Sequence, residues 1–245
     1  MKILALDTSG LVATVAIAED DKLTAVYSIQ NKTTHSQILM PMMDSIKNML
    51  GLELDTIDAI AVAAGPGSFT GLRIGSATAK GLGLALDKPI IPVPTVDGMA
   101  YGLYGQEKII CPMMDARRSQ VYTGIYTFES NKGADTELTY TMKTLHEQFV
   151  TSVEDIAVQL NSYGKEVVLL GDGVPVYIDK LKELLTVPFT QAPFFNNRQS
   201  AAVVAALGFI YYEQGKYVHA DDFAPEYLRA SQAEREAKEK GKMSS

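Results

Sequence analysis

Cysteine and histidine are scarce in this chain of 245 residues, which has one cysteine and three histidines. The single cysteine, Cys111, cannot form a disulfide within the chain, and we expect a cytoplasmic protein. None of His35, His146 and His219 has a histidine or cysteine three or four residues away, as a metal site on one helix would require. The sequence therefore indicates neither a disulfide framework nor a histidine-based metal centre.

Positive charge and long apolar runs are also in short supply. The chain has 22 Lys and Arg against 29 Asp and Glu, a net charge of −7. A protein that binds nucleic acid unaided usually has a basic surplus, so we expect any RNA to be contacted mainly through a partner. No apolar run approaches the ~18 residues of a membrane helix, and the first residues match no signal peptide, so we expect no membrane segment.

The most distinctive stretch runs from Ala61 to Asp97 and predicts a strand, a glycine-rich turn, a helix and a second strand. The turn begins at Gly65-Pro66-Gly67-Ser68, because glycine tolerates positive φ and proline cannot donate to a sheet. Ser68 or Thr70 can cap the helix that follows. The turn could cradle an anion, but no Lys-Ser/Thr pair of a Walker loop follows it, and a plain strand-to-helix turn is favoured.

Small residues recur four positions apart along this helix, at Gly71, Gly75, Ala79 and Gly83. Glycine inside a helix costs roughly 0.5–1 kcal/mol relative to alanine, so close packing must compensate. Arg73 and Lys80 exclude a bilayer as the surroundings. Two alternatives stay open at equal weight: the stripe packs on this chain's own sheet, or on a helix of another protein.

The first residues predict two apolar strands joined by Asp7-Thr8-Ser9-Gly10, a sequence well suited to a hairpin turn. A third strand follows over residues 22–28. Asp7 ends a buried strand, where it could hold a metal-bound phosphate or cap the turn, and the cap is favoured. Asp7, Thr8 and Ser9 are nevertheless the candidates for nucleotide binding.

A methionine-rich helix is predicted from Ile38 to Leu50, with an apolar arc wider than the ~100° that faces one core. Such width favours a helix covered on two sides, and methionine adapts well to protein-binding surfaces. A deeply buried core helix is the alternative. We expect this helix and the glycine-striped helix to lie side by side and to dock on a partner chain. The predicted interface residues are Met40, Met43, Gly71, Gly75 and Ala79.

Both halves of the sequence begin with a hairpin that has an aspartate at its turn. The second runs from Lys108 to Phe128, with the turn Asp115-Ala116-Arg117-Arg118, and repeats the order of residues 3–17. We therefore predict two α/β lobes that meet near residues 101–107.

The predicted first lobe spans residues 1–103 and the second residues 104–199. Residues 200–245 are expected to form a helix that packs back on the hinge or first lobe, followed by a mobile tail. Within the second lobe, residues 129–150 predict a variable excursion, and Ser152 is expected to cap a helix that ends at Ser162.

Strand-end carboxylates are the only hint of chemistry that the residues themselves provide. Asp7, Asp115 and Asp172 all follow predicted strands and could converge on one cleft, as in a nucleotide–phosphate–metal site. Cys111 lies in an apolar strand, where a thiol is usually inert, and no G-x-S-x-G elbow is present. Nothing in these patterns requires an enzyme.

Five motifs resemble, in order along the chain, the TsaB (YeaZ) family. They are ILALDTSG (3–10), GPGSFTGLRIGSATAKGLG (65–83), DARRSQVY (115–122), LGDG (170–173) and PEYLRASQAE (225–234). The resemblance implies the actin–Hsp70–sugar-kinase fold, with a mixed sheet and helices in each lobe. It also implies a role in bacterial synthesis of threonylcarbamoyladenosine at position 37 of tRNA, beside the catalytic paralogue TsaD and the ATPase TsaE, with a homodimer possible when the chain is alone.

The resemblance also implies what this chain has lost. The catalytic paralogue has a His-x-x-x-His metal site after the glycine-rich helix, where this sequence has Thr95 and Met99. A hydroxyl and a thioether cannot replace two imidazoles for Fe²⁺ or Zn²⁺, so we expect no metal and no catalytic residue. ATP or ADP at a complex interface is the only cofactor considered. The alternative is an ATP-dependent small-molecule kinase of the same fold; a metallopeptidase fails for want of ligands.

Overall fold

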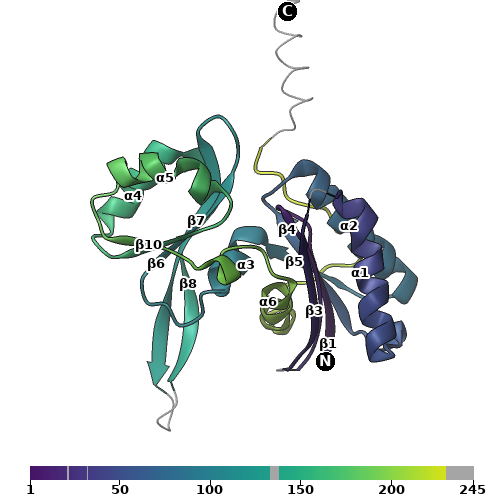
Figure 1. The fold of residues 1–245 in the computed structure, drawn as a ribbon. Helices are drawn as coiled ribbons and strands as arrows, with labels where there is room; N and C mark the ends of the chain where they lie inside the picture. Colours follow the sequence, from purple (N-terminus) through teal and green to yellow (C-terminus); the bar gives the residue numbers. More distant parts are fainter. Residues whose placement is uncertain (21, 32, 133–137, 230–245) are drawn as a thin grey trace, which may run out of the picture.

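The computed structural model describes residues 1–20, 22–31, 33–132 and 138–229. Its first half forms a five-stranded sheet in the order β3-β2-β1-β4-β5 (Figure 1). The strands are β1 (Lys2–Asp7), β2 (Val12–Glu19), β3 (Lys22–Gln30), β4 (Ala59–Gly65) and β5 (Ile90–Pro94). The first three strands form an antiparallel meander, and β4 and β5 continue the sheet in parallel with β1.

The second half builds another sheet with the same topology, in the order β8-β7-β6-β9-β10. Its strands are β6 (Ile109–Asp115), β7 (Gln120–Lys132), β8 (Leu138–Ser152), β9 (Val167–Leu170) and β10 (Phe189–Gln191). The predicted two-lobed α/β architecture with a mixed sheet in each lobe is therefore confirmed. The expected excursion at 129–150 is instead largely the extension of the β7–β8 hairpin.

Two helices cover the outer face of each sheet. In the first lobe these are α1 (His35–Leu50) and α2 (Phe69–Leu86). The short helix η1 (Leu54–Thr56) follows α1 and precedes β4. In the second lobe they are α4 (Val153–Ser162) and α5 (Gly173–Leu184). Ser68 caps α2 and Ser152 caps α4, each accepting a backbone N–H three residues on, as the sequence predicts.

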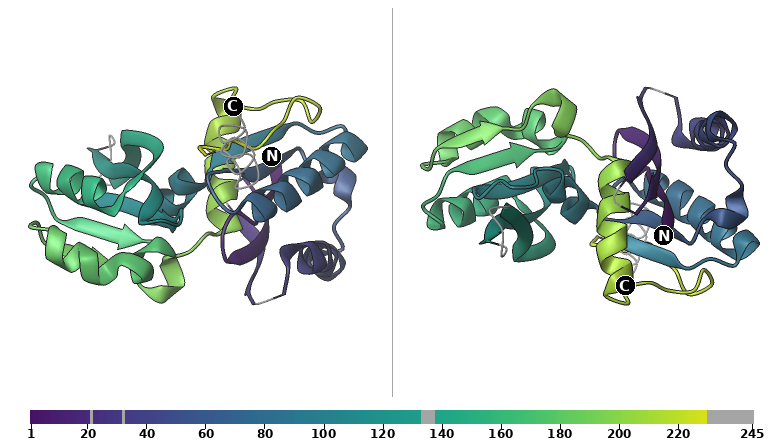
Figure 2. Two further views of the ribbon diagram at one scale, coloured as in Figure 1. Left: turned by 90° about the horizontal axis from the view of Figure 1, so that it is seen from above. Right: turned by 90° about the horizontal axis from the view of Figure 1, so that it is seen from below.

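The inner faces are covered by two helices that cross between the lobes. Helix α3 (Thr95–Tyr101) follows β5, yet its buried side chains pack against the second sheet. Helix α6 (Ala201–Glu213) follows β10 and the short helix η2 (Phe194–Asn196), and packs against the first sheet. Both helices lie in the middle of the molecule, between the two sheets (Figures 1 and 2).

Small side chains let α6 approach the first sheet closely. Ala5, Ala16 and Ala61 are fully buried on the strands that face it, and a Cβ on Gly208 would lie 3.0 Å from that of Ala61. This contact buries an unusually apolar helix, whose sequence shows no polar face.

A half-buried carboxylate, that of Asp97, joins α3, α6 and β7 where the lobes meet. The hydroxyl groups of Tyr126 and Tyr211 donate to the two carboxylate oxygens of Asp97, at 2.6 and 2.9 Å. Burial raises the pKa of Asp97, and these two hydrogen bonds oppose that shift. Three elements from both lobes are thus held at one point.

Two predictions can be placed only in part. The expected mobile tail from Ser231, and the last part of the PEYLRASQAE motif, lie outside the described residues. Among the helices that are described, none is long and apolar enough to cross a membrane.

Candidate functional site

The nucleotide-binding candidates Asp7, Thr8 and Ser9 are almost completely buried at the β1–β2 turn. The backbone N–H and the hydroxyl of Ser9 both donate to one oxygen of Asp7, at 2.8 and 2.6 Å. The Thr8 hydroxyl donates to the carbonyl oxygen of Gly71 at 2.7 Å. All three side chains are therefore engaged in bonds within the first lobe, and a bound phosphate would have to displace these bonds or use the backbone.

Burial raises the pKa of Asp7 to about 6, although the hydrogen bonds from Ser9 and the nearby His35 act against the shift. His35 itself lies at the start of α1 and contacts the carbonyl oxygen of Gly10 through Nε2, at 2.8 Å. A charged carboxylate at this turn thus costs free energy, which fits a turn-capping residue better than a solvated metal ligand.

The glycine stripe of α2 packs on this chain's own turn. A Cβ on Gly71 would overlap the carbonyl oxygen of Thr8, and one on Gly75 would lie 2.5 Å from the Thr8 hydroxyl oxygen. Ala79 is fully buried in the first-lobe core. The sequence left open whether the stripe packs within this chain or on another protein, and it packs within this chain. The prediction of a groove on Gly71, Gly75 and Ala79 for a partner's backbone is corrected, because the first lobe already fills that space.

Of the two methionines predicted to face a partner, Met40 is exposed but Met43 is not. Met40 is 53% exposed on α1, whereas Met43 is only 9% exposed and packs in the first-lobe core with Met42 and Ile46. The sequence missed Met49, which is 85% exposed at the end of α1. Helices α1 and α2 do lie side by side on one face of the first sheet (Figure 1). Further large apolar side chains exposed on this pair are Leu50 and Leu84.

A segment near the end of the chain, residues 220–229, crosses the glycine-rich turn; we call it the C-terminal strap. The Glu226 N–H donates to the carbonyl oxygen of Ala64 at 2.7 Å, and a Cβ on Gly65 would overlap the carbonyl oxygen of Glu226. Gly65 has φ +122°, a conformation that favours glycine. The turn predicted as a possible anion cradle is therefore covered by the chain itself.

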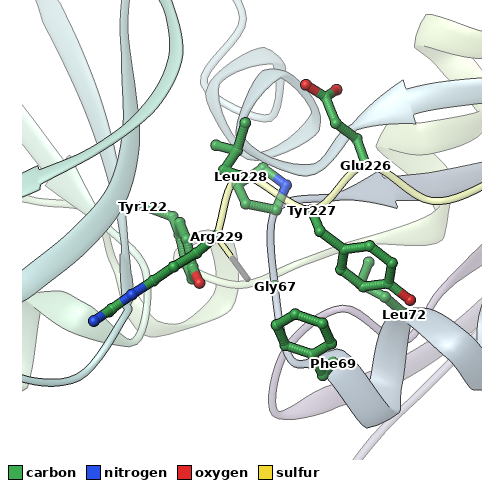
Figure 3. Close-up of a pocket in the computed structure, with 9 residues that line it drawn as sticks. Gly67, Phe69, Leu72, Tyr122, Glu226, Tyr227, Leu228 and Arg229 are labelled. Atoms are coloured by element: carbon green, nitrogen blue, oxygen red, sulfur yellow. The ribbon is translucent and has the colours of Figure 1, made fainter. Parts of the chain in front are cut away.

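The strap continues from the first lobe to the second. Tyr227 stacks on Phe69 of α2, with ring centroids 4.5 Å apart (Figure 3). The Arg229 guanidinium then donates to the carbonyl oxygen of Ala116, 2.8 Å away in the second lobe. Tyr122 of β7 lies beside Arg229 in the same pocket. No sequence pattern indicated this bridge, which depends on contacts more than a hundred residues apart.

The corresponding turn of the second lobe, residues 115–119, is open. Arg117, Arg118 and Ser119 are exposed and all have positive φ (+64°, +57° and +57°), which is uncommon for residues other than glycine. Asp115 accepts the Arg117 N–H and the Tyr177 hydroxyl, both at 2.8 Å.

Two of the three strand-end carboxylates come together. The Asp115 N–H points to a carboxylate oxygen of Asp172 at 3.4 Å, and burial raises the pKa of Asp172 while Arg198 opposes that shift. The third strand-end carboxylate, Asp7, lies at the β1–β2 turn of the first lobe and accepts its hydrogen bonds from Ser9. Among the described residues, no group of three His, Cys, Asp or Glu side chains is arranged to hold a metal ion.

Thr95 and Met99, which the family resemblance places where a catalytic paralogue would have two histidines, lie in α3. They are 2% and 4% exposed, and Met99 packs in the second-lobe inner core, its methyl group against Gly171. Their hydroxyl and thioether are poor ligands for iron or zinc, so these residues do not fit such a site.

Comparisons of the sequence and of the structure with known proteins agree on one family. A sequence model of the TsaD family, described as tRNA N6-adenosine threonylcarbamoyltransferase, matches residues 29–237. The chain is similar to proteins named tRNA threonylcarbamoyladenosine biosynthesis protein TsaB. It is 29% identical to the one from Bacillus subtilis, covering 96% of each chain, and 30% identical to that from Haemophilus influenzae, covering 94% of each.

A solved structure described as YeaZ from Pseudomonas aeruginosa has the same fold. Its TM-score with this chain is 0.75 at 27% identity, with 93% of this chain and 99% of that chain covered. This match and the two equivalent sheets confirm the predicted two-lobed α/β fold with a mixed sheet in each lobe. The chain belongs to the TsaB (YeaZ) family.

Proposed function

We propose that this chain is a non-catalytic subunit in the synthesis of threonylcarbamoyladenosine at position 37 of tRNA. Its relatives are named for this biosynthesis. In this proposal it pairs with a TsaD-type catalytic paralogue in the cytoplasm, activates it, and works with a TsaE-type ATPase. The tRNA is contacted mainly through the assembled complex.

The observation that carries the proposal is the filled space at Thr95 and Met99. In a catalytic paralogue these positions would supply two metal-binding imidazoles to a cleft. Here they supply a core hydroxyl and a core thioether that are almost completely shielded from solvent. A chain of this fold that lacks these two ligands would keep the shape needed to pair with the catalytic paralogue, but it could not carry out the paralogue's reaction.

The exposed apolar side chains of α1 and α2 support pairing through the first lobe. Met40, Met49 and Leu84 are 53%, 85% and 49% exposed on neighbouring helices. Solvent-exposed apolar groups that gather on one face mark contact surfaces in soluble proteins. We propose that this face binds the catalytic paralogue, and a second copy of this chain when the paralogue is absent.

A nucleotide at Asp7, Thr8 and Ser9 remains the less favoured part of the proposal. A kinase of this fold needs a phosphate-binding turn in each lobe, but the first turn is bonded internally. The second turn offers arginine side chains in place of glycine backbone. ATP or ADP would then bind only where a partner completes the site.

Reconstitution tests the function directly. The purified chain is mixed with a TsaD-type paralogue and a TsaE-type ATPase, and modified adenosine in tRNA is measured by mass spectrometry. We expect a stable complex and a strict requirement for this chain, no bound iron or zinc by elemental analysis, and no ATP turnover by the chain alone. Robust turnover with a small-molecule acceptor would favour the kinase alternative, and modification without this chain would contradict the proposal.

A further inference from the structure

Arginine is distributed unevenly over this acidic molecule. The chain has six arginines, of which Arg235 lies outside the described residues. The other five surround the line where the C-terminal strap passes from the first lobe to the second. We define them as the arginine rim: Arg73, Arg117, Arg118, Arg198 and Arg229. We propose that the arginine rim, with the aromatic pair Phe69–Tyr227, is a contact site for the backbone and bases of a single-stranded RNA loop.

The members of the rim are joined through a few direct contacts. Arg73 of α2 lies 3.4 Å from the hydroxyl oxygen of Tyr227, two residues before Arg229. Arg229 binds the carbonyl oxygen of Ala116, the residue before Arg117. One continuous surface thus leads from α2 along the strap to the β6–β7 turn.

The last member of the rim is reached through two carboxylates. Arg198 Nη1 donates to the carbonyl and side-chain oxygens of Asn197, at 3.0 and 3.2 Å, and its positive charge opposes the burial that raises the pKa of Asp172. Asp172 in turn faces the backbone of Asp115 at the same turn. The surface therefore ends at the loop before α6.

Two guanidinium groups of the rim, those of Arg117 and Arg118, remain available to a ligand. Arg117 is 88% exposed and its Nε lies at the limit of an ion pair with Asp115, 4.0 Å away. Arg118 is exposed and makes no hydrogen bond or ion pair with the described residues.

Asp115, Asp172 and Glu226 lie beside the rim, and Asp221 and Asp222 are exposed at the start of the strap. Asp115 accepts hydrogen bonds from Tyr177 and the Arg117 backbone, and Glu226 accepts one from Gln148 at 2.7 Å. Five of the six arginines thus lie along this line, in a chain whose net charge is −7.

Arginine together with a stacked aromatic pair favours RNA over other anions. The guanidinium fork matches phosphate oxygens in a bidentate geometry that lysine cannot provide. Phe69 and Tyr227 lie 4.5 Å apart and nearly parallel, with Tyr227 38% exposed and the Arg73 guanidinium 5.9 Å from the Phe69 ring. Unpaired bases are bound by stacking on such aromatic and arginine planes, whereas an acidic peptide would use the charges alone.

This inference rests on the proposed function, which supplies a tRNA anticodon loop as the substrate. It differs from the expectation drawn from net charge, because it gives this chain its own share of the RNA contacts. A local positive surface can bind phosphate even when the whole protein is acidic.

The experiment uses the complex with the TsaD-type paralogue and a fluorescent anticodon stem-loop RNA. Binding is measured by anisotropy at several salt concentrations for wild type and for the double variant Arg117→Glu/Arg118→Glu. We expect at least a tenfold loss of affinity at low salt. The slope of log affinity against log salt should fall by about 1.4, since each phosphate contact to a single strand contributes roughly 0.7.

Two matched variants control for charge and for stacking. Lys165→Glu reverses one positive charge, half the charge change of the double variant, at an exposed residue before β9, the opposite end of that strand from Gly171, and should bind RNA like wild type. Tyr227→Ala removes the stack on Phe69 and should weaken binding, whereas Tyr227→Phe keeps the ring and should bind within about twofold of wild type. Circular dichroism checks that all variants fold.

The outcomes separate this inference from the proposed function. Size-exclusion chromatography with the paralogue is run on the same samples. If the wild-type chain forms no complex, the proposed function fails. If the complex forms but the double variant binds RNA with unchanged affinity and salt slope, only the inference of an RNA site is overturned. An acidic peptide is tested as a second probe. If the double variant loses binding to this peptide but still binds RNA like wild type, the inference of an RNA site is likewise overturned.

Discussion

The two lobes share one strand order but use their first hairpin turn in opposite ways. In the first lobe the turn at Asp7–Ser9 is buried and bonded to α2. In the second lobe the equivalent turn exposes Arg117 and Arg118 in left-handed conformations. The same topology has therefore produced a structural joint in one lobe and an open, charged surface in the other.

Helix α2 explains why the first turn is closed. Its glycines at 71 and 75 let the first turns of the helix reach the backbone and hydroxyl of Thr8. In the second lobe the equivalent helix, α5, approaches a different part of its sheet: a Cβ on Gly173 would lie 2.9 Å from the carbonyl oxygen of Met113, within β6. Helix α5 reaches the turn through the Tyr177 hydroxyl, which donates to Asp115, and leaves Arg117 and Arg118 exposed. Small residues in a helix thus decide whether a neighbouring turn is available for binding.

The largest expected effect comes from breaking the closed joint. Gly71→Ala places a methyl group on the carbonyl oxygen of Thr8, and backbone cannot move aside as a side chain can. We expect a loss of at least about 4 kcal/mol in the free energy of unfolding, above the usual cost of overpacking. Urea unfolding followed by circular dichroism measures it.

Gly81→Ala in the same helix is the control, because a Cβ there meets nothing within 4 Å. It should stabilise the chain by about 0.5–1 kcal/mol through helix propensity alone. Equal effects of the two substitutions would show that the close approach of α2 does not hold the joint.

The second prediction separates core from surface on α1. Met43→Glu buries a charge in the first-lobe core and should destabilise the fold by about 3 kcal/mol. Met40→Glu lies at an exposed position and should leave the unfolding free energy within about 0.5 kcal/mol. Only Met40→Glu should therefore give a folded chain with weakened binding to the paralogue, measured by size-exclusion chromatography. Wild-type affinity of folded Met40→Glu would remove this side chain from the interface.

The third prediction concerns the pH dependence that the buried turn imposes. The folded pKa of Asp7 is about 6, above the ordinary value of 3.8, so the folded chain binds more protons between these pH values. This group's contribution to stability is therefore fully present below about pH 4 and is lost as pH rises through about 6, amounting to roughly 2–3 kcal/mol.

Asp7→Asn removes that titration and should make unfolding free energy less dependent on pH between 4 and 6, relative to wild type. Thermal unfolding of both proteins across this range measures the difference. Identical pH profiles would mean that Asp7 is charged at no cost in the folded chain, which would contradict its burial as the cause.

The smallest expected effect lies in the open turn. Arg118→Gly relieves a left-handed conformation and should raise the unfolding free energy by about 1 kcal/mol. The same change should lower affinity for the RNA loop, because it removes a rim guanidinium. Arg118→Lys, which keeps charge but not the planar fork, should leave stability unchanged and lower RNA affinity less than glycine does. A stabilised Arg118→Gly that binds RNA fully would sharpen the comparison by limiting the site to the other rim residues.

Much of this protein follows from its sequence alone. Apolar runs and turn residues predict the strands of both hairpins, and the serines at 68 and 152 predict where two helices begin. The repeated aspartate-tipped hairpin predicts two similar lobes. These features depend on neighbours within a few residues, where backbone preference and hydrogen-bond capping act locally.

The tertiary structure decided which surface each element covers. The stripe at Gly71 could face this chain or another, and Met43 could face the core or a partner; the pattern of a helix is the same in either case. The exchange of α3 and α6 between the sheets and the path of the strap over Gly65 likewise depend on contacts between distant residues. Periodicity shows that a face is apolar, but only the packed chain determines what lies against it.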